Sequence, residues 1–361
     1  MGKNSDLHKA REAKMDEWYT RREDIEAELS HYEKFFKGKT VYCNCDDPET
    51  SEFWQFFKRN FKPWELKRLI ATHYEPDEKN YAYFLDLSED TNGDGIVDWN
   101  DEPAIKQLPC NGDFRSAACV ELLEQADIVV TNPPFSLVRE YIAQLVEHNK
   151  DFIIMAPLNA VKYKEIFPLI KSGKITLGYK PTGKDTLFRI PEDYAEYLLK
   201  NKKEGSGYKI INGEILGRAN VIWLTSLDIE KRYLKLDLRG NYYRKENFPK
   251  YLNYDAIDVD KVSNIPCDYE GNMGVPISFL DSFNSAQFDI IGLSHAKGLL
   301  EGTQEIGEQW IADYRAIGKT GHLSAKSHDM VGYVDGKPKA YYPRVIIKNK
   351  EPEPRRYPDE D

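Results

Sequence analysis

Short apolar segments alternate with amphipathic segments over the first 230 residues of the chain. Apolar side chains recur at steps of three and four between Ile25 and Phe36, which predicts a helix over residues 5–37 that ends at Gly38. Further helices are predicted over residues 51–61, 116–125 and 138–148. Buried strands are predicted over residues 40–45, 68–74, 126–131, 152–156 and 221–226. This alternation favours an α/β fold with a mostly parallel, twisted sheet, in which ligands bind at the carboxyl ends of the strands.

The alternation of strands and helices fades near residue 230, where tyrosines and basic residues begin to interleave. We therefore expect an N-terminal helical segment at 1–38, a core at 39–230 and a separate region at 231–350. An acidic insertion occupies residues 75–103 of the core, and the Pro-rich, charged tail at 351–361 is expected to be disordered.

The charge of the chain is distributed unevenly. The 361 residues sum to −10, but residues 75–102 contain ten acids and one base, and residues 351–361 contain five acids and two arginines. The other 322 residues therefore sum to +2. This excludes a globally basic protein but leaves room for a basic face that binds nucleic acid.

Membrane and secreted classes do not fit the sequence. No apolar run approaches the roughly 20 residues that span a bilayer, and the N-terminus lacks the apolar stretch of a signal peptide. The five cysteines are an odd number in a long chain and do not suit a disulfide scaffold. We expect a cytoplasmic protein without a membrane partner.

The most informative motif is the tetrapeptide Asn132, Pro133, Pro134 and Phe135, which directly follows a predicted buried strand. The two prolines hold a stiff, extended turn, which presents the Asn132 side chain and the Pro133 carbonyl as hydrogen-bond acceptors. These acceptors and the aromatic ring of Phe135 suit an exocyclic amine on a stacked heterocycle, which makes these four residues the predicted catalytic set. The alternative is an ordinary loop that happens to carry two prolines.

At this motif the sequence resembles the amino-methyltransferases that use S-adenosylmethionine, and more closely the EcoRI-type adenine-specific DNA methyltransferases. The resemblance extends to the DEWYT segment at 16–20, the YCNCDDP loop within 41–48 and the RANVIWLTSLD strand at 218–228. It implies a Rossmann-like methyltransferase core and a C-terminal target-recognition region. It also implies that Trp18, Tyr19 and Thr20 contact the methionine end of the cofactor, and that Asn44 belongs to the cofactor loop.

Acidic residues after the first two strands are candidates for cofactor binding. Asp46 and Asp47 can attract the ammonium and sulfonium charges, although these acids and Ser51 also fit a helix cap. After the second strand, Glu75 is the candidate for the ribose hydroxyls, with Asp77 as its substitute and a solvated loop charge as the alternative.

A further pair of candidates precedes the helix predicted at 116–125. The resemblance implies that Asp113 accepts the adenine amine of the cofactor and that Phe114 packs on its ring; Asp113 could alternatively cap the helix. Cytosine C5 chemistry would need a cysteine nucleophile beside a proline. Cys110 and Cys267 both follow prolines, but neither follows a buried strand, and we interpret both as structural.

The acidic insertion contains a pattern typical of calcium loops. Ligand oxygens at positions 1, 3, 5, 9 and 12, with a glycine at position 6, resemble a dockerin loop and predict a structural calcium site. The predicted ligands are Asp90, Asn92, Asp94, Asp98 and Asp101. Surface turns rich in Gly and Asp imitate this pattern.

Basic and aromatic residues interleave after the core, which suits phosphate contact and base stacking. The predicted DNA-binding residues are Lys231, Arg232, Arg239, Tyr242, Tyr243, Arg244 and Lys245. A solvated surface would look similar.

The sequence therefore predicts a site-specific adenine-N6 methyltransferase that acts on a flipped-out adenine of double-stranded DNA. A cognate restriction endonuclease is a candidate partner. One alternative keeps the fold but methylates RNA or protein glutamine. The other is a calcium-stabilised DNA-binding module without catalysis.

Overall fold

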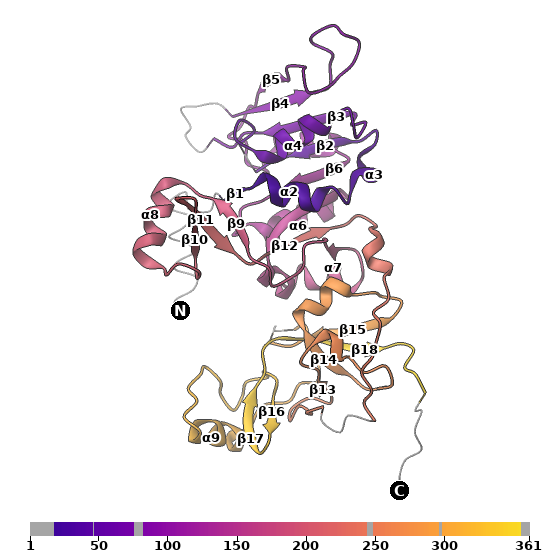
Figure 1. Ribbon diagram of the computed structural model, residues 1–361, viewed down its shortest axis with the longest axis vertical. Coiled ribbons are helices and arrows are strands. Elements are labelled where there is room, and N and C mark those ends of the chain that lie inside the picture. The colour runs from indigo at the N-terminus through magenta and orange to yellow at the C-terminus, as the bar shows by residue number, and fades with distance from the viewer. Residues whose placement is uncertain (1–17, 46, 76–81, 244–247, 296–297, 355–361) are drawn as a thin grey trace. The chain divides into compact units, whose positions relative to one another are not determined.

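The protein is represented by a computed structural model that describes residues 18–45, 47–75, 82–243, 248–295 and 298–354. The chain forms two compact units. Unit 1 comprises residues 1–160 and 175–227, and unit 2 comprises residues 161–174 and 228–361. Figure 1 labels most of the helices and strands of both units.

Unit 1 is built on an eight-stranded sheet in the order β5-β4-β3-β2-β6-β7-β12-β8. Its strands are β2 (Thr40–Cys43), β3 (Arg68–Thr72), β4 (Tyr83–Leu87), β5 (Ala104–Gln107), β6 (Ile128–Thr131), β7 (Asp151–Pro157), β8 (Thr176–Leu177) and β12 (Val221–Thr225). The central strands β3, β2, β6 and β7 are parallel to one another, whereas the outer strands all pair antiparallel. The prediction of a mostly parallel sheet is thus right only for the centre of a mixed sheet.

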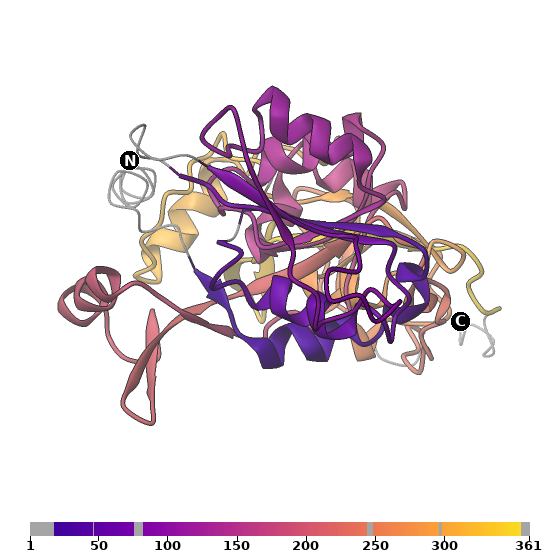
Figure 2. The same cartoon turned by 90° about the horizontal axis from the view of Figure 1, so that it is seen from above.

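Helices cover both faces of this sheet. They are α2 (Arg22–Leu29), α3 (Glu33–Phe36), α4 (Glu52–Asn60), α5 (Ala117–Gln125) and α6 (Val138–Glu147). Figure 2 shows the indigo helices α2 and α4 on one face, and the purple and magenta helices α5 and α6 on the other. Ser51 caps α4 by accepting hydrogen bonds from the backbone of Phe53 and Trp54, and both of these side chains are buried. The three helices predicted after residue 50 are confirmed.

The predicted N-terminal helix is only partly right over the described residues. A short strand, β1 (Tyr19–Thr20), precedes α2, and α2 is separated from α3 by a turn. β1 pairs antiparallel with β9 (Thr186–Arg189), so a distant part of the chain overrides the local helical pattern. The buried stripe from Ile25 to Phe36 is correct, but two helices carry it.

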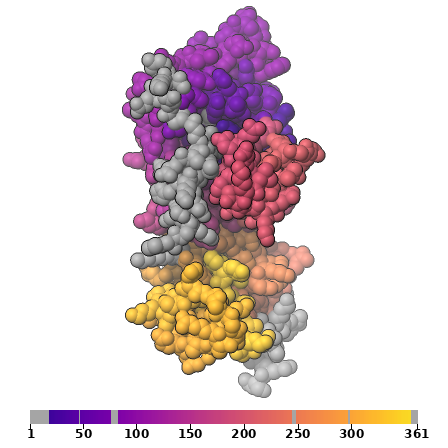
Figure 3. All heavy atoms as spheres, turned by 90° about the vertical axis from the view of Figure 1, so that its left-hand side faces the viewer, coloured from indigo at the N-terminus to yellow at the C-terminus, as the bar shows by residue number. Residues whose placement is uncertain are grey.

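β1 belongs to a second, antiparallel sheet of unit 1 in the order β1-β9-β11-β10. Strand β10 (Tyr208–Ile211) and strand β11 (Glu214–Ala219) form a hairpin, and helix α8 (Glu192–Asn201) follows β9. The two hairpin residues Asn212 and Gly213 both have positive φ, as the tight turn requires. Figure 3 shows strands β9, β10 and β11 together with α8 as a rose-coloured lobe. The sequence patterns did not predict this sheet.

Unit 2 contains a four-stranded sheet in the order β13-β14-β18-β15 and a separate hairpin of β16 and β17. Its strands are β13 (Ile257–Asp258), β14 (Met273–Pro276), β15 (Phe288–Leu293), β16 (Val331–Val334), β17 (Lys337–Ala340) and β18 (Arg344–Asn349). Its α-helices are α7 (Phe167–Lys171) and α9 (Glu308–Ala316). The short 3₁₀ helices are η1 (Leu158–Lys162), η2 (Glu230–Tyr233), η3 (Val262–Asn264) and η4 (Ile277–Ser282). The boundary between the two units at residues 160 and 161 falls within η1. Across the described ranges, no helix combines the length and apolar character of a membrane crossing.

A buried carboxylate with a partly buried arginine partner lies in the core of unit 2. The Asp258 carboxylate is 3% exposed and accepts hydrogen bonds from the Tyr251 hydroxyl at 2.7 Å and from Arg344 Nε at 2.8 Å. Burial and the nearby carboxylate raise the pKa of Tyr251. Gly274 leaves room for this hydroxyl, because a β-carbon there would lie 2.1 Å from it.

Candidate active site

Asn132 lies at the carboxyl end of β6 and is 7% exposed. Its Nδ2 donates a hydrogen bond to the Trp18 carbonyl at 2.7 Å. Its Oδ1 is buried and has no hydrogen-bond partner in the described part of the chain. A buried acceptor without a partner is uncommon and costly, so Asn132 Oδ1 is available to accept a hydrogen bond from a ligand.

The turn after Asn132 is surrounded by aromatic rings. Pro133 is buried and Phe135 is half-buried. The Trp18 ring centroid lies 6.3 Å from that of Phe135, 5.3 Å from that of Phe188 and 5.7 Å from that of Tyr194. Phe188 comes from β9 and Tyr194 from α8, and neither was predicted. The aromatic spacing within residues 186–194 is the sequence signal that could have suggested them.

The segment predicted to touch the methionine end of the cofactor enters this site through β1. Trp18 contributes its carbonyl and its ring, as described above. Thr20 is 4% exposed, and its hydroxyl donates to the sulfur of Met155 on β7 at 3.3 Å. The Thr20 side chain therefore anchors β1 on the large sheet, and Tyr19 pairs with Arg189 in the small sheet.

Asn44 follows β2 and is 3% exposed. Its side-chain oxygen accepts from the Tyr141 hydroxyl, and its backbone carbonyl accepts from the Thr131 hydroxyl. Burial raises the pKa of Tyr141 well above its usual value, so this phenol remains a donor. In this structure Asn44 joins the ends of β2 and β6 through its hydrogen bonds.

The acids after β2 and β3 lie on either side of His73, which no sequence pattern marks as a site residue. His73 Nδ1 is 3.5 Å from Asp47 Oδ1, and His73 Nε2 is 3.7 Å from Glu75 Oε2. The imidazole also stacks on Tyr83, with ring centroids 5.0 Å apart. Asp47 and Glu75 are thus brought together, while Asp46 lies outside the described residues.

The capping alternative for Asp47 does not hold. Ser51 caps α4, whereas Asp47 Oδ1 accepts a hydrogen bond from the Glu49 backbone at 3.0 Å. This local turn holds the carboxylate at the carboxyl end of the sheet.

The loop at 111–114 packs against the end of β3. The Glu75 N–H donates to the Asn111 carbonyl at 2.9 Å. Gly112 has a φ of +80°, and a β-carbon there would lie 2.1 Å from the His73 carbonyl oxygen. Only glycine allows the loop and the end of β3 to come this close. The contact brings Glu75, the candidate for the ribose, near the loop that carries Asp113, the candidate for the adenine.

Asp113 is paired with Arg115, whose Nε and Nη2 approach its two carboxylate oxygens at 2.9 Å and 2.6 Å. It does not cap α5, since Ser116 does so. Phe114 is 6% exposed and packs edge-on against Tyr141, with ring centroids 5.0 Å apart. The Asp113 carboxylate therefore already has a cationic partner in this structure, which was not predicted.

These positions lie on one edge of the sheet, because the carboxyl ends of the parallel strands β3, β2 and β6 meet there. Carboxylates follow β2 and β3, an aromatic ring precedes α5, and an amide acceptor follows β6. This set of groups fits an adenosyl cofactor that carries positive charge, together with an amine beside Asn132.

The predicted calcium loop receives no support. Asp90 accepts hydrogen bonds from the backbone of Gly93 and Gly95 at 2.6 and 2.7 Å, and Asp101 accepts from Thr91 and Asp98 at 2.7 and 2.8 Å. The other predicted ligands accept from the loop in the same way, namely Asn92, Asp94 and Asp98. Within the described ranges, no group of three or more His, Cys, Asp or Glu side chains could hold a metal ion.

The predicted DNA-binding residues that are described all belong to unit 2. Lys231 and Arg232 lie in η2, and Arg232 Nη1 donates to the Gly173 carbonyl at 2.8 Å. Arg239 has a side chain that is 84% exposed and pairs with Asp237 at 2.7 Å. The Tyr242 ring lies 5.1 Å from the Tyr243 ring and 4.3 Å from that of Tyr269. The remaining two predicted residues, Arg244 and Lys245, lie outside the described residues.

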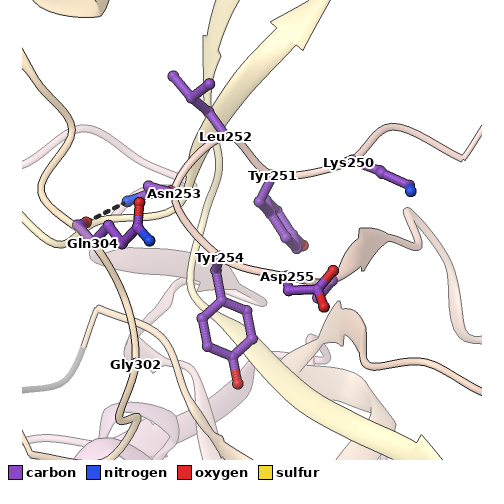
Figure 4. A pocket seen from close by; sticks show the side chains of 9 residues that line it. Lys250, Tyr251, Leu252, Asn253, Tyr254, Asp255, Gly302 and Gln304 are labelled. Carbon is purple, nitrogen blue, oxygen red and sulfur yellow. Dashed lines mark hydrogen bonds between the residues drawn. The ribbon is translucent and has the colours of Figure 1, made fainter.

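Unit 2 also contains a pocket of about 330 Å³, shown in Figure 4. It is lined by residues 250–256, Gly302 and Gln304, and contains none of the residues predicted for catalysis. Asn253 is 2% exposed and donates to the Gln304 carbonyl at 3.1 Å, which shapes one wall.

The parallel centre of the sheet and the Asn-Pro-Pro-Phe turn at its edge are consistent with a methyltransferase core. A family model described as "Adenine-specific methyltransferase EcoRI" matches residues 6–350, and the chain belongs to this family. It is therefore an adenine-specific DNA methyltransferase, as the sequence predicted. The family implies S-adenosylmethionine as the cofactor.

Curated relatives cover most of the chain. "Type II methyltransferase M.EcoRI" of Escherichia coli is 42% identical over 297 residues, which are 80% of this chain and 89% of that protein. "Type II methyltransferase M.MpnI" of Mycoplasma pneumoniae is 35% identical over 353 residues, which are 96% of this chain and 98% of that protein. No solved structure matches.

Proposed function

We propose that the chain is a type II methyltransferase that methylates N6 of one adenine within a specific site of double-stranded DNA. The observation that carries this proposal is the buried Oδ1 of Asn132, which lacks a partner among the described residues at the carboxyl end of β6. An exocyclic amine supplies the missing donor. In a duplex this amine is inside the base stack, so the target adenine has to be flipped out to reach Asn132.

The catalytic turn acts by orientation. Asn132 Oδ1 and the Pro133 carbonyl accept the two amine hydrogens, which directs the nitrogen lone pair away from both acceptors. Phe135 stacks on the adenine ring, and the prolines keep the two acceptors at a fixed spacing. No side chain has to remove a proton before transfer, because the amine nitrogen is itself the nucleophile and its proton leaves afterwards. Positioning and the exclusion of water supply the acceleration.

The cofactor is assigned to the neighbouring groups on the same edge. S-adenosylmethionine, when bound, supplies a methyl group activated by a positively charged sulfur. Asp47 would hold its cationic end, Glu75 its ribose hydroxyls, and Phe114 its adenine ring, with His73 setting the spacing of the two acids. Asp113 would reach the adenine amine only if Arg115 shares its carboxylate.

Unit 2 is proposed to hold the DNA and to read the target site. Its exposed Arg239 and its tyrosines at 242 and 243 are suited to phosphate contact and base stacking. A restriction endonuclease that cuts the same unmethylated site is the partner protein expected for such an enzyme.

The test is transfer of labelled methyl groups from S-adenosylmethionine into DNA, RNA and protein, followed by mapping of the modified base. We expect N6-methyladenine in DNA at one short sequence. Asn132→Ala should lower the transfer rate by about 10²–10³-fold, by analogy with loss of one aimed hydrogen-bonding group at an active site. Asn201→Ala, which changes an exposed asparagine at the end of α8, is the matched control. Full activity of Asn132→Ala, or labelling of RNA or protein instead of DNA, would refute the proposal.

A further inference from the structure

The hydrogen bond between Asn132 and the start of β1 determines which atom of the Asn132 amide faces the substrate. Nδ2 donates to the Trp18 carbonyl at 2.7 Å, so the opposite atom of the amide is necessarily the oxygen. That oxygen is buried and has no partner among the described residues. The side chain is therefore prepared as an acceptor before any amine is present.

The residues that follow Trp18 hold this part of the chain in place. Thr20 pairs with Phe188 in β9, and its hydroxyl binds the Met155 sulfur of the large sheet. Arg21 Nε donates to the Leu187 carbonyl at 3.0 Å. The start of β1 is thus attached both to the small sheet and to the sheet that carries Asn132.

The Trp18 ring adds a further constraint on this position. It packs among Phe135, Phe188 and Tyr194 and lies over Gly217 of β11. A β-carbon at residue 217 would lie 3.2 Å from the indole and 2.8 Å from the Ile190 side chain. The absence of a side chain at Gly217 therefore makes room for the Trp18 ring against the small sheet.

We propose that the Trp18 backbone carbonyl is a positioning group that holds the Asn132 amide with its oxygen toward the amine, and that it requires an amide rather than a carboxylate at residue 132. This inference rests on the proposed function. In the variant Asn132→Asp, an ionised side chain would place a carboxylate oxygen at the position of Nδ2, against the Trp18 carbonyl oxygen, and the two would repel each other. The protonated side chain of the same variant could instead donate its O–H to that carbonyl and keep the second oxygen as an acceptor.

The first test is Asn132→Asp, assayed in single turnovers with saturating S-adenosylmethionine and DNA from pH 6 to 8.5. We expect the single-turnover rate constant to be about 10²-fold below wild type at pH 8.5, because the orienting bond is replaced by a repulsion. The ratio of the wild-type to the variant rate constant should fall at least about tenfold towards pH 6 as the carboxyl becomes protonated, since burial and the carbonyl raise its pKa. The wild-type profile corrects for the phenols packed nearby, namely Tyr194 on Trp18 and Tyr141 on Asn44.

Two results of this test contradict the positioning role: activity of Asn132→Asp equal to wild type at pH 8.5, or a ratio that does not change with pH. If wild type itself transfers no methyl group to DNA adenine, the proposed function fails instead, so the two failures are distinguishable. Thermal melting of both proteins shows whether the variant is folded.

A second variant perturbs Trp18 without changing any group of the catalytic turn. Gly217→Ala should displace the indole by a few tenths of an ångström and lower kcat about tenfold, while the KM for DNA changes less than about threefold. Gly207→Ala in the same lobe is the matched control, because its β-carbon meets mainly the flexible Lys202 side chain. An unchanged kcat for Gly217→Ala, or an equal loss in both variants, speaks against the role of Trp18.

Discussion

Replacing Gly112 with alanine perturbs the contact between the loop at 111–114 and the end of β3. The new β-carbon would lie 2.1 Å from the His73 carbonyl oxygen and 3.1 Å from the Tyr74 α-carbon. Ordinary contacts between non-bonded heavy atoms are roughly 3.5 Å, so the two backbones have to separate by about 1.4 Å. The φ of +80° also has to be kept by a residue with a side chain.

Each part of this change has a typical energetic cost. The left-handed conformation costs alanine about 1–2 kcal/mol, and the steric overlap costs about 1–3 kcal/mol. The free energy of unfolding should therefore fall by about 2–5 kcal/mol. Since the loop carries the candidate adenine contacts and β3 leads to Glu75, the Kd for S-adenosylmethionine should rise about tenfold, which corresponds to ~1.4 kcal/mol.

Gly93→Ala separates the two costs. Gly93 has a φ of +78°, but a β-carbon there meets nothing within 4 Å. This control should lose only the conformational part and bind S-adenosylmethionine with unchanged Kd. Urea unfolding measures the stability of both variants, and titration calorimetry measures the affinity. Equal loss of stability in the two variants, with wild-type affinity in both, would refute the reasoning.

Three further predictions concern stability. Ser51→Ala removes the cap of α4 and should cost about 1 kcal/mol in urea unfolding; no change would mean that the helix start is held otherwise. Asp258→Ala leaves the partly buried Arg344 without its carboxylate and should cost about 3 kcal/mol, whereas a loss below about 1 kcal/mol would show that water replaces the carboxylate. Burial opposes ionisation of Asp86, but hydrogen bonds from Arg68 outweigh it and hold the pKa at about 2. Because the folded pKa lies below the unfolded value, this stabilisation is present above about pH 4 and is lost as the pH falls towards 2. Asp86→Asn should therefore make stability depend less steeply on pH between about 4 and 2. An unchanged acid-unfolding curve contradicts the assignment.

The parts of the site that could be predicted depend on short stretches of sequence. Asn132 and Phe135 follow their strand directly, so recognising β6 was enough to place the turn at the edge of the sheet. The same holds for Asp47 and Glu75, which follow β2 and β3. The carboxyl ends of neighbouring parallel strands lie together at one edge of the sheet, whichever residues connect the strands.

The parts that could not be predicted depend on pairings between distant segments. β1 has only two residues, too few to show a periodicity, and it becomes a strand because β9 pairs with it. This pairing brings Trp18 and Phe188 to the Asn132 turn, and no local sequence pattern predicts it. Asp113 looks the same in the sequence with or without a partner, although Arg115 two residues later is a usable signal.

The acidic insertion shows a different limit of motif reading. The spacing of its acids matches a calcium loop, but spacing does not show where the oxygens point. Asp90 and Asp101 accept hydrogen bonds from the loop's own backbone. A pattern of residue types is compatible with a metal site and with a self-bonded turn.

The path of the chain between the two units has a consequence for engineering new specificities. Residues 161–174 belong to unit 2, although they lie between β7 and β8 of unit 1. Lys171 Nζ donates to the Ile291 carbonyl at 2.8 Å, and Arg232 reaches the Gly173 carbonyl at the same distance. A chimaera joined only at residue 228 would combine one parent's 161–174 segment with the other parent's C-terminal half. Exchange of this unit between relatives therefore requires two grafts, one internal and one terminal, and single-crossover recombinants should be selected against.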